Sequence, residues 1–107
     1  MTNSVIIKHN KDTIKFMKSN RPDKKYTAII TYGTKHPGIN KGDQRIVHFG
    51  GIKKNGEPYS QYFDGTGLGI YSGYNHLDME RRNRYYARHG TNPPLYTPMW
   101  FSHNFLW

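Results

Sequence analysis

The sequence contains no cysteine, which excludes disulfide bonds and thiolate metal sites and leaves the redox compartment open. It also lacks any apolar run near the roughly 20 residues that span a bilayer. Nothing at its beginning resembles a signal peptide. We therefore expect a protein that has no membrane partner.

Acidic residues are scarce as well. Seven Asp and Glu stand against sixteen Lys and Arg, which gives a formal net charge of +9. This excess favours anionic partners such as nucleic acid or an acidic protein surface. Aromatic residues make up 15% of the chain, more than a disordered basic tail would carry. The composition and length predict a single small basic domain over residues 1–107.

Short β-prone segments occupy the first half of the chain. They are residues 4–9, 13–18, 25–31 and 44–50. Turn residues between the first two segments indicate a hairpin, and Ile14 and Phe16 alternate with Lys15 and Met17 as in a half-buried strand. A further hairpin is expected around Asn55-Gly56, a dipeptide that suits a type I′ turn.

One main helix is predicted at about residues 77–88, with Asn75 as a candidate N-cap and Gly90 as its stop. Thr97 and Pro98 precede the aromatic tail as an N-cap and a first helical residue would, so a short C-terminal helix or turn is expected. The order of elements predicts an α+β fold with a small antiparallel sheet of about four to five short strands.

The predicted main helix is polar almost all round. On a helical projection, five side chains share an arc of about 100°. They are Asp78, Arg81, Tyr85, Arg88 and His89. Arginine forks match phosphate oxygens, which favours a phosphate site with the exposed Arg84 and Arg88 as the better candidates. Alternatively, Asp78, Arg81 and Tyr85 form a hydrogen-bonded stripe that packs on the sheet.

The segments "VHFG", "YSQYFDG", "HLDMERRNRYYARHG" and a tail ending in "FLW" follow one another in the C-terminal 60 residues or so. This order resembles a family of small, basic, uncharacterised proteins encoded by large DNA viruses of algae and protists. The matching positions are His48, Phe49, Gly50, His76, Asp78, Arg81, Tyr85, Arg88, His89, Leu106 and Trp107. The Gly-rich stretch within residues 65–73 departs from the family pattern as an insertion, and the tail lacks the arginine expected before its final aromatic residues.

The resemblance implies a viral origin and a virion or genome-associated setting, with no established activity. A stripe of such residues is either a ligand site or a buried polar network that stabilises the fold. For the network, the candidate members are His48, His76, Asp78, Tyr85 and His89.

Chemical motifs are weak. "GTGLGI" lacks both the dinucleotide fingerprint and the P-loop lysine, and no serine sits in a nucleophile elbow. The histidines show no short metal-ligand spacing, although a composite site from His48, His76, His89 and an Asp stays open. We predict a non-enzymatic protein with no catalytic residue, no metal, no cofactor and no small-molecule substrate.

The sequence thus favours a small basic viral structural protein, a virion component that contacts capsid proteins, the genome or both. It would be found in the virion, and in the host cytoplasm or viral factory during assembly. The alternative is a DNA-binding accessory protein without sequence preference, and a metal-dependent nuclease is a distant third. Candidate contacts to DNA or an acidic partner are Arg81, Arg82, Arg84, Arg88, Lys24, Lys25, Lys53 and Lys54. The tail residues Trp100, Phe101, Phe105 and Trp107 either close the core or anchor a partner.

Overall fold

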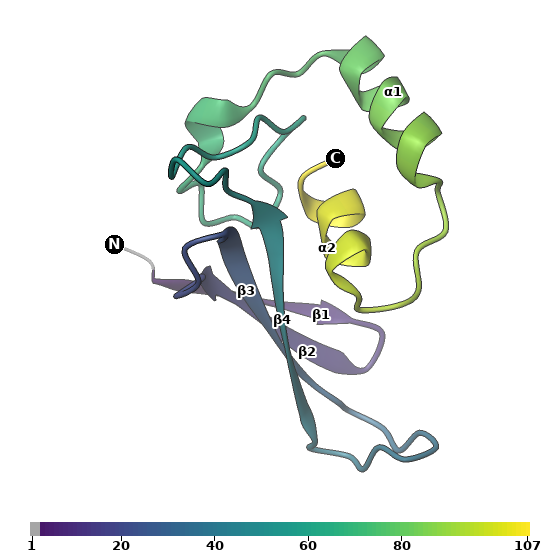
Figure 1. The fold of residues 1–107 in the computed structure, drawn as a ribbon. Coiled ribbons are helices and arrows are strands. Elements are labelled where there is room, and N and C mark those ends of the chain that lie inside the picture. Colours follow the sequence, from purple (N-terminus) through teal and green to yellow (C-terminus); the bar gives the residue numbers. More distant parts are fainter. Residues whose placement is uncertain (1–2) are drawn as a thin grey trace.

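A computed structural model describes residues 3–107 and shows an α+β fold, as the sequence predicts. Four strands pair antiparallel in chain order and form a single meander (Figure 1). They are β1 (Ser4–His9), β2 (Asp12–Lys18), β3 (Lys24–Thr31) and β4 (Gln44–Gly51). A short 3-10 helix, η1 (Ser72–Tyr74), and two α-helices, α1 (Met79–His89) and α2 (Pro98–Phe105), follow the sheet.

The predicted first hairpin is present. His9 of β1 lies opposite Asp12 of β2, so the connection is the two-residue turn Asn10-Lys11. Asn10 has φ 54°, a left-handed conformation that asparagine tolerates better than most residues. The residue types in this turn therefore set the register of the hairpin.

One face of the sheet forms the core. Ile14 and Phe16 are fully buried, whereas their neighbours Lys15 and Met17 point to the opposite face, as the predicted alternation requires. Helix α2 covers this core face, and its Phe101 is fully buried as well. Tyr26, Ala28, Ile30, Val47, Phe49 and Leu106 complete the centre of the core.

Helix α1 starts two residues later than predicted. Its N-cap is Asp78 and not Asn75, because the Asp78 carboxylate accepts hydrogen bonds from the backbone N–H groups of Glu80 (3.0 Å) and Arg81 (3.3 Å). The C-terminal stop is as predicted: Gly90 has φ 77°, and its N–H donates to the carbonyl of Tyr86 at 2.8 Å.

The second predicted hairpin is present in a short form, but its turn differs from the predicted type. Strand β4 ends at Gly51, and beyond it Ile52 and Pro58 form an isolated bridge. Two backbone hydrogen bonds flank this bridge: Lys53 N–H donates to the carbonyl of Glu57 at 2.9 Å, and Tyr59 N–H donates to the carbonyl of Gly51 at 3.1 Å. Gly56 has φ 87°, but Asn55 does not have a positive φ, so the turn is not type I′.

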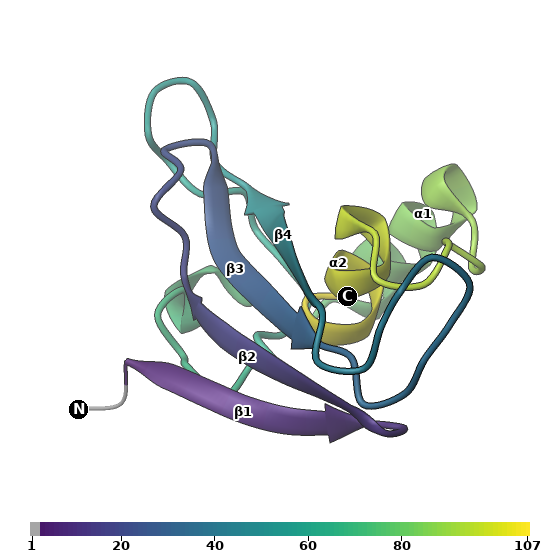
Figure 2. The same ribbon diagram turned by 90° about the horizontal axis from the view of Figure 1, so that it is seen from below.

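Helix α2 lies between the sheet and α1 (Figure 2). Thr97 caps α2 with a hydrogen bond from Trp100 N–H at 3.2 Å, and Pro98 occupies the first turn, as predicted. Because α1 has α2 and the C-terminal residues as its neighbours, the alternative in which its stripe packs directly on the sheet is wrong. The contacts of Tyr85 and Arg82 described below show how α1 is held instead.

Candidate anion-binding pocket

Helix α1 is joined to α2 through Tyr86, whose hydroxyl donates to the carbonyl oxygen of His103 at 2.9 Å, and through Tyr85. The Tyr85 side chain is buried, stacks on the Trp107 ring at 4.3 Å between centroids, and hydrogen-bonds His103 Nδ1 through its hydroxyl at 3.0 Å. His103 Nε2 lies 2.8 Å from the carbonyl oxygen of Gly90, which can only accept. In the neutral ring, Nε2 therefore carries the proton and Nδ1 accepts from Tyr85. Burial raises the pKa of Tyr85 to about 12, so its hydroxyl stays protonated near neutral pH.

Arg82 ties α1 to the last residue. Its Nε donates to the carbonyl oxygen of Trp107 at 2.6 Å, and its guanidinium lies over the rings of Tyr62 and Tyr86 at 5.2 and 5.3 Å. The structure thus assigns Arg82 to internal packing, which corrects its prediction as a binding residue.

A pocket of about 330 Å³ opens beside the buried edge of α1. Four of its lining residues come from the predicted helical arc, and the others come from β3, the end of β4, the loop after β4, α2 and the last two residues of the chain. The lining residues are Lys25, Gly51, Tyr59, Ser60, Arg81, Tyr85, Arg88, His89, Ser102, Leu106 and Trp107. We call this the arginine pocket.

The arginine pocket is electropositive. Arg81 and Arg88 are exposed, and no hydrogen bond or ion pair within residues 3–107 holds either guanidinium. No Asp or Glu of the described chain lines the pocket. The positive charge also acts on His76, just before α1. Burial is the larger cause that lowers the pKa of His76, the charge of Arg81 is the second cause, and the Asp78 carboxylate opposes the shift. A positive pocket with free arginine forks suits an anion.

Lys25 forms the buried wall of the pocket. It is 2% exposed, and its Nζ donates to the carbonyl oxygen of Tyr59 (2.5 Å) and to Oε1 of Gln61 (2.7 Å). Burial lowers the pKa of Lys25 to about 8, although the nearby Asp64 carboxylate opposes the shift. The prediction of Lys25 as a surface contact is therefore corrected.

The burial of Lys25 depends on Gly50. This glycine has φ 79°, and a Cβ there would lie 3.0 Å from both Cβ and Cδ of Lys25. A side chain at position 50 would thus crowd the path of Lys25 toward Gln61. Sequence reasoning missed this arrangement, since strand alternation alone places Lys25 on the same face as Thr27.

The other predicted basic residues lie outside the pocket lining. Arg84 is exposed on α1 next to it, and Lys53 and Lys54 are exposed on the loop after β4. Lys53 Nζ lies 5.4 Å from the ring centre of Tyr59, which brings it close to the rim. Lys24 is half-buried in β3 opposite Gly51.

Within residues 3–107, the predicted polar network separates into three parts that no hydrogen bond links, although His76 and Tyr85 both pack on the Trp107 ring, at 5.2 and 4.3 Å between ring centroids. His48 Nδ1 bonds Thr27 Oγ1 at 2.7 Å on the outer face of the sheet. His76 Nδ1 accepts from the Asp78 N–H at 2.9 Å, at the start of α1. Tyr85 belongs to the contact with His103, and the His89 ring packs on it at 4.6 Å. The proposal of one common network is therefore wrong.

The structure also places the residues considered for a metal site and the aromatic residues of the C-terminal tail. In the part of the chain that the structure describes, no three His, Cys, Asp or Glu side chains gather closely enough to hold a metal ion. Phe101 is in the core, and Trp100, Phe105 and Trp107 are half-buried against it.

Within residues 3–107, no helix is both long enough and apolar enough to cross a membrane.

In comparisons with known proteins, no family model, no curated protein and no solved structure matches this chain. What the arginine pocket does must therefore be argued from its own geometry and charge.

Proposed function

We propose that this chain is a non-enzymatic basic binding protein that holds phosphate groups of nucleic acid in the arginine pocket and along α1. The setting we propose is the one that the sequence resemblance implies, a virion component in contact with the genome. Binding of this kind needs no sequence preference, because phosphate contacts carry no base information.

The observation that carries this proposal is the convergence of the exposed Arg81 and Arg88 on one pocket whose lining, among residues 3–107, contains no Asp or Glu. Two guanidinium groups that have no partner among residues 3–107 offer several N–H donors in fixed planes, which suits phosphate oxygens. Ser60 and Ser102 add hydroxyl donors from two other segments. Arg84 extends the positive surface along the exposed side of α1.

The test is binding of the full chain to a random DNA duplex at about 50 and 200 mM salt, with and without substitutions. We expect the log-log salt slope of the Arg81→Ala/Arg88→Ala variant to fall by about 0.9 for each phosphate that the variant no longer neutralises. The matched control is Lys35→Ala/Lys41→Ala, which removes the same charge from the exposed loop between β3 and β4. If both double variants weaken duplex binding equally, the effect comes from net charge alone, and the proposed phosphate site in the pocket is refuted.

Arg84→Ala adds a second comparison. If it weakens duplex binding more than Arg81→Ala does, the phosphates run along the exposed helix surface rather than into the pocket. A duplex that does not bind at about 50 mM salt would refute the proposed function altogether.

A second candidate function, contact with an acidic capsid protein, is favoured by an apolar groove between the segments before α1 and the C-terminal residues. Phe63 and Leu77 are 53% and 62% exposed and line this groove of about 300 Å³. The formal net charge of +9 supplies the attraction for an acidic partner. Binding to a purified acidic shell protein should then be lost in Leu77→Ser and change by less than about tenfold between the two salt concentrations.

A further inference from the structure

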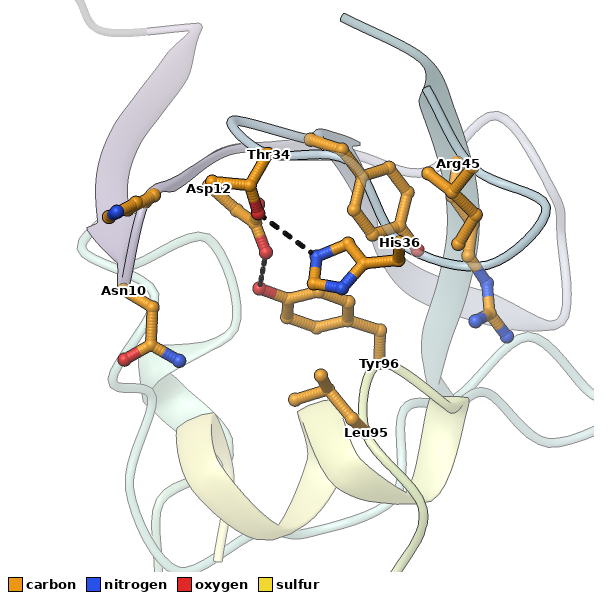
Figure 3. Close-up of a pocket in the computed structure, with 10 residues that line it drawn as sticks. Asn10, Asp12, Thr34, His36, Arg45, Leu95 and Tyr96 are labelled. Carbon is orange, nitrogen blue, oxygen red and sulfur yellow. Dashed lines mark hydrogen bonds between the residues drawn. The ribbon is translucent and has the colours of Figure 1, made fainter. Parts of the chain in front are cut away.

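A second cavity lies at the opposite end of β3 from the arginine pocket, and no sequence motif pointed to it. This cleft of about 570 Å³ is formed by the β1–β2 turn, the start of β2, the loop between β3 and β4, the start of β4 and the segment before α2. Figure 3 shows the rings of His36 and Tyr96 between Asn10 on one side and Arg45 on the other. Its volume is within the range of small-ligand pockets, about 300–1,000 Å³.

The floor of the cleft is a buried polar contact around Tyr96. The Tyr96 hydroxyl donates to Oδ2 of Asp12 at 2.6 Å and also lies 3.0 Å from Nδ1 of His9. The second Asp12 oxygen accepts from the N–H of Gly33 at 2.9 Å. Burial alone would raise the pKa of Asp12, but these two hydrogen bonds, together with His36 and His9, hold it below its ordinary value. Each carboxylate oxygen therefore has an internal donor, and Asp12 does not act as an open cation site.

Tyr96 is held in a conformation that bulky residues rarely adopt. Its φ is 60°, and its side chain is 1% exposed. Left-handed backbone at such a residue is strained, and it persists where the surrounding contacts over-determine it. The preceding Leu95, whose side chain is 52% exposed, lines the cleft beside this residue.

The wall opposite Leu95 is built before any ligand binds. His36 and Ile39 exchange two backbone hydrogen bonds, each 2.9 Å long. Thr34 Oγ1 lies 3.2 Å from His36 Nε2, and the loop is closed where Gly42 N–H donates to the carbonyl of Tyr32 at 2.8 Å. A preformed wall lowers the entropic loss when a ligand binds.

The open groups of the cleft combine an apolar surface with positive charge. Leu95 and Ile39 offer apolar contact, whereas Lys11 and Arg45 are exposed cations, and no hydrogen bond within residues 3–107 holds the Arg45 guanidinium. Asp12 is the one acidic residue of the lining, and it is internally bonded. A suitable ligand therefore has a flat, largely apolar body and an anionic group.

We propose that this cleft holds one unstacked nucleotide of a single strand, with its base against Leu95 and His36 and its phosphates on Lys11 and Arg45. The two cations come from different segments, the β1–β2 turn and the start of β4, as would suit the phosphates on both sides of one nucleotide. Asn10 and Thr34 supply donors and acceptors for the base edge. The inference rests on the proposed nucleic-acid binding and makes it selective for single strands.

The first test is an NMR titration of the ¹⁵N-labelled full chain with thymidine 5′-monophosphate, thymidine and inorganic phosphate. The monophosphate should shift the amides of residues 33–36, 38 and 39 and of Leu95 saturably. It should bind at least about tenfold more tightly than either thymidine or phosphate, since only it makes both kinds of contact. Equal affinity for monophosphate and inorganic phosphate would overturn the inference.

The second test compares Arg45→Gln with Lys41→Gln. Both remove one exposed charge from the same end of the molecule, but Lys41 is not among the residues that line the cleft. Arg45→Gln should weaken both the monophosphate and a ten-residue oligothymidine by about tenfold, the effect of losing one charged hydrogen bond. Lys41→Gln should weaken them by less than about twofold. Equal losses in the two variants would refute the site.

The third comparison distinguishes a nucleotide within a strand from a free nucleotide, and it distinguishes binding in the cleft from binding in the arginine pocket. The oligothymidine should bind more tightly than the monophosphate and more tightly than a duplex of equal length. If the monophosphate and the oligothymidine bind with equal affinity, the ligand is a free nucleotide, and the proposal of a bound single strand is refuted. If the chain binds duplex but shows no saturable binding of the monophosphate, the proposed nucleotide site in the cleft is refuted and the proposed phosphate site in the arginine pocket is retained. Monophosphate binding that Arg81→Ala/Arg88→Ala leaves unchanged, without duplex binding, supports the cleft and refutes the pocket.

Discussion

The buried Lys25 predicts an unusual dependence of stability on pH. Its pKa of about 8 in the folded protein lies below the ordinary value of 10.5 that applies to the unfolded chain. Between these values the unfolded state binds more protons, so the free energy of unfolding rises with pH. Below about pH 8 the buried charge lowers stability by its full amount, about 3 kcal/mol at 1.4 kcal/mol per pKa unit. About 2 kcal/mol of this is regained between pH 7 and 9.5.

The assay is urea unfolding at pH 7, 8, 9 and 9.5, repeated for Lys25→Met and for Lys24→Met. Lys24 is the matched control, because it is the adjacent lysine and is only half-buried. The series stops at pH 9.5 because tyrosines reverse the trend above it. Tyr85, with its pKa raised to about 12 from 10.0, stabilises the fold below pH 10, and that contribution is lost as the pH rises further.

The expected result is a stability difference between Lys25→Met and the parent chain that shifts by about 2 kcal/mol between pH 7 and 9.5 in favour of the parent. Lys24→Met should show no such shift. The absolute effect of Lys25→Met is not the readout, since it also leaves the carbonyl of Tyr59 and Oε1 of Gln61 without their donor. A difference that stays constant within about 0.5 kcal/mol would refute the reasoning that Lys25 is a buried charge.

Three further substitutions test local features of the fold. Asp78→Ala removes the α1 cap and should lower stability by about 1 kcal/mol, with faster hydrogen exchange in the first turn; unchanged exchange there would contradict the cap. Tyr96→Phe should cost about 1–3 kcal/mol in urea unfolding, because a buried carboxylate loses its hydroxyl donor, and a neutral result would deny that bond. Gly33→Ala places a Cβ 1.7 Å from the carbonyl oxygen of Lys11, so its thermal midpoint should fall far below that of Gly73→Ala, which meets nothing within 4 Å. Similar midpoints for the two alanine variants would show that the Gly33 contact relaxes without penalty.

Local signals in the sequence were sufficient for most of the fold. Strand alternation is a property of neighbouring residues, so Ile14 and Phe16 could be assigned to one face without knowledge of what covers it. Gly90 and the Thr97-Pro98 pair act within a single turn of their helices, and both are used as predicted. The N-cap of α1 was misplaced because Asn75 and Asp78 are both competent caps and only the path of the loop selects between them.

The candidate site was predictable in part, for the same reason. Helical geometry alone groups Arg81, Tyr85, Arg88 and His89, and the arginine pocket contains all four. What this face meets depends on chain segments far away in the sequence. His103 and Trp107 hold Tyr85, and they are 18 and 22 positions further along the chain, beyond any periodic signal.

The sequence by itself thus determined the basic charge, the strands and their faces, and which residues share the arc of α1, because each follows from composition or from contacts a few residues apart. Only the tertiary structure decided that Arg82 is bound internally, that Lys25 passes beside Gly50 into the interior, and that the segment before α2 closes a cleft over the β3–β4 loop. These features join residues distant in the chain. Their energies depend on burial and packing, which no local pattern of residue types encodes.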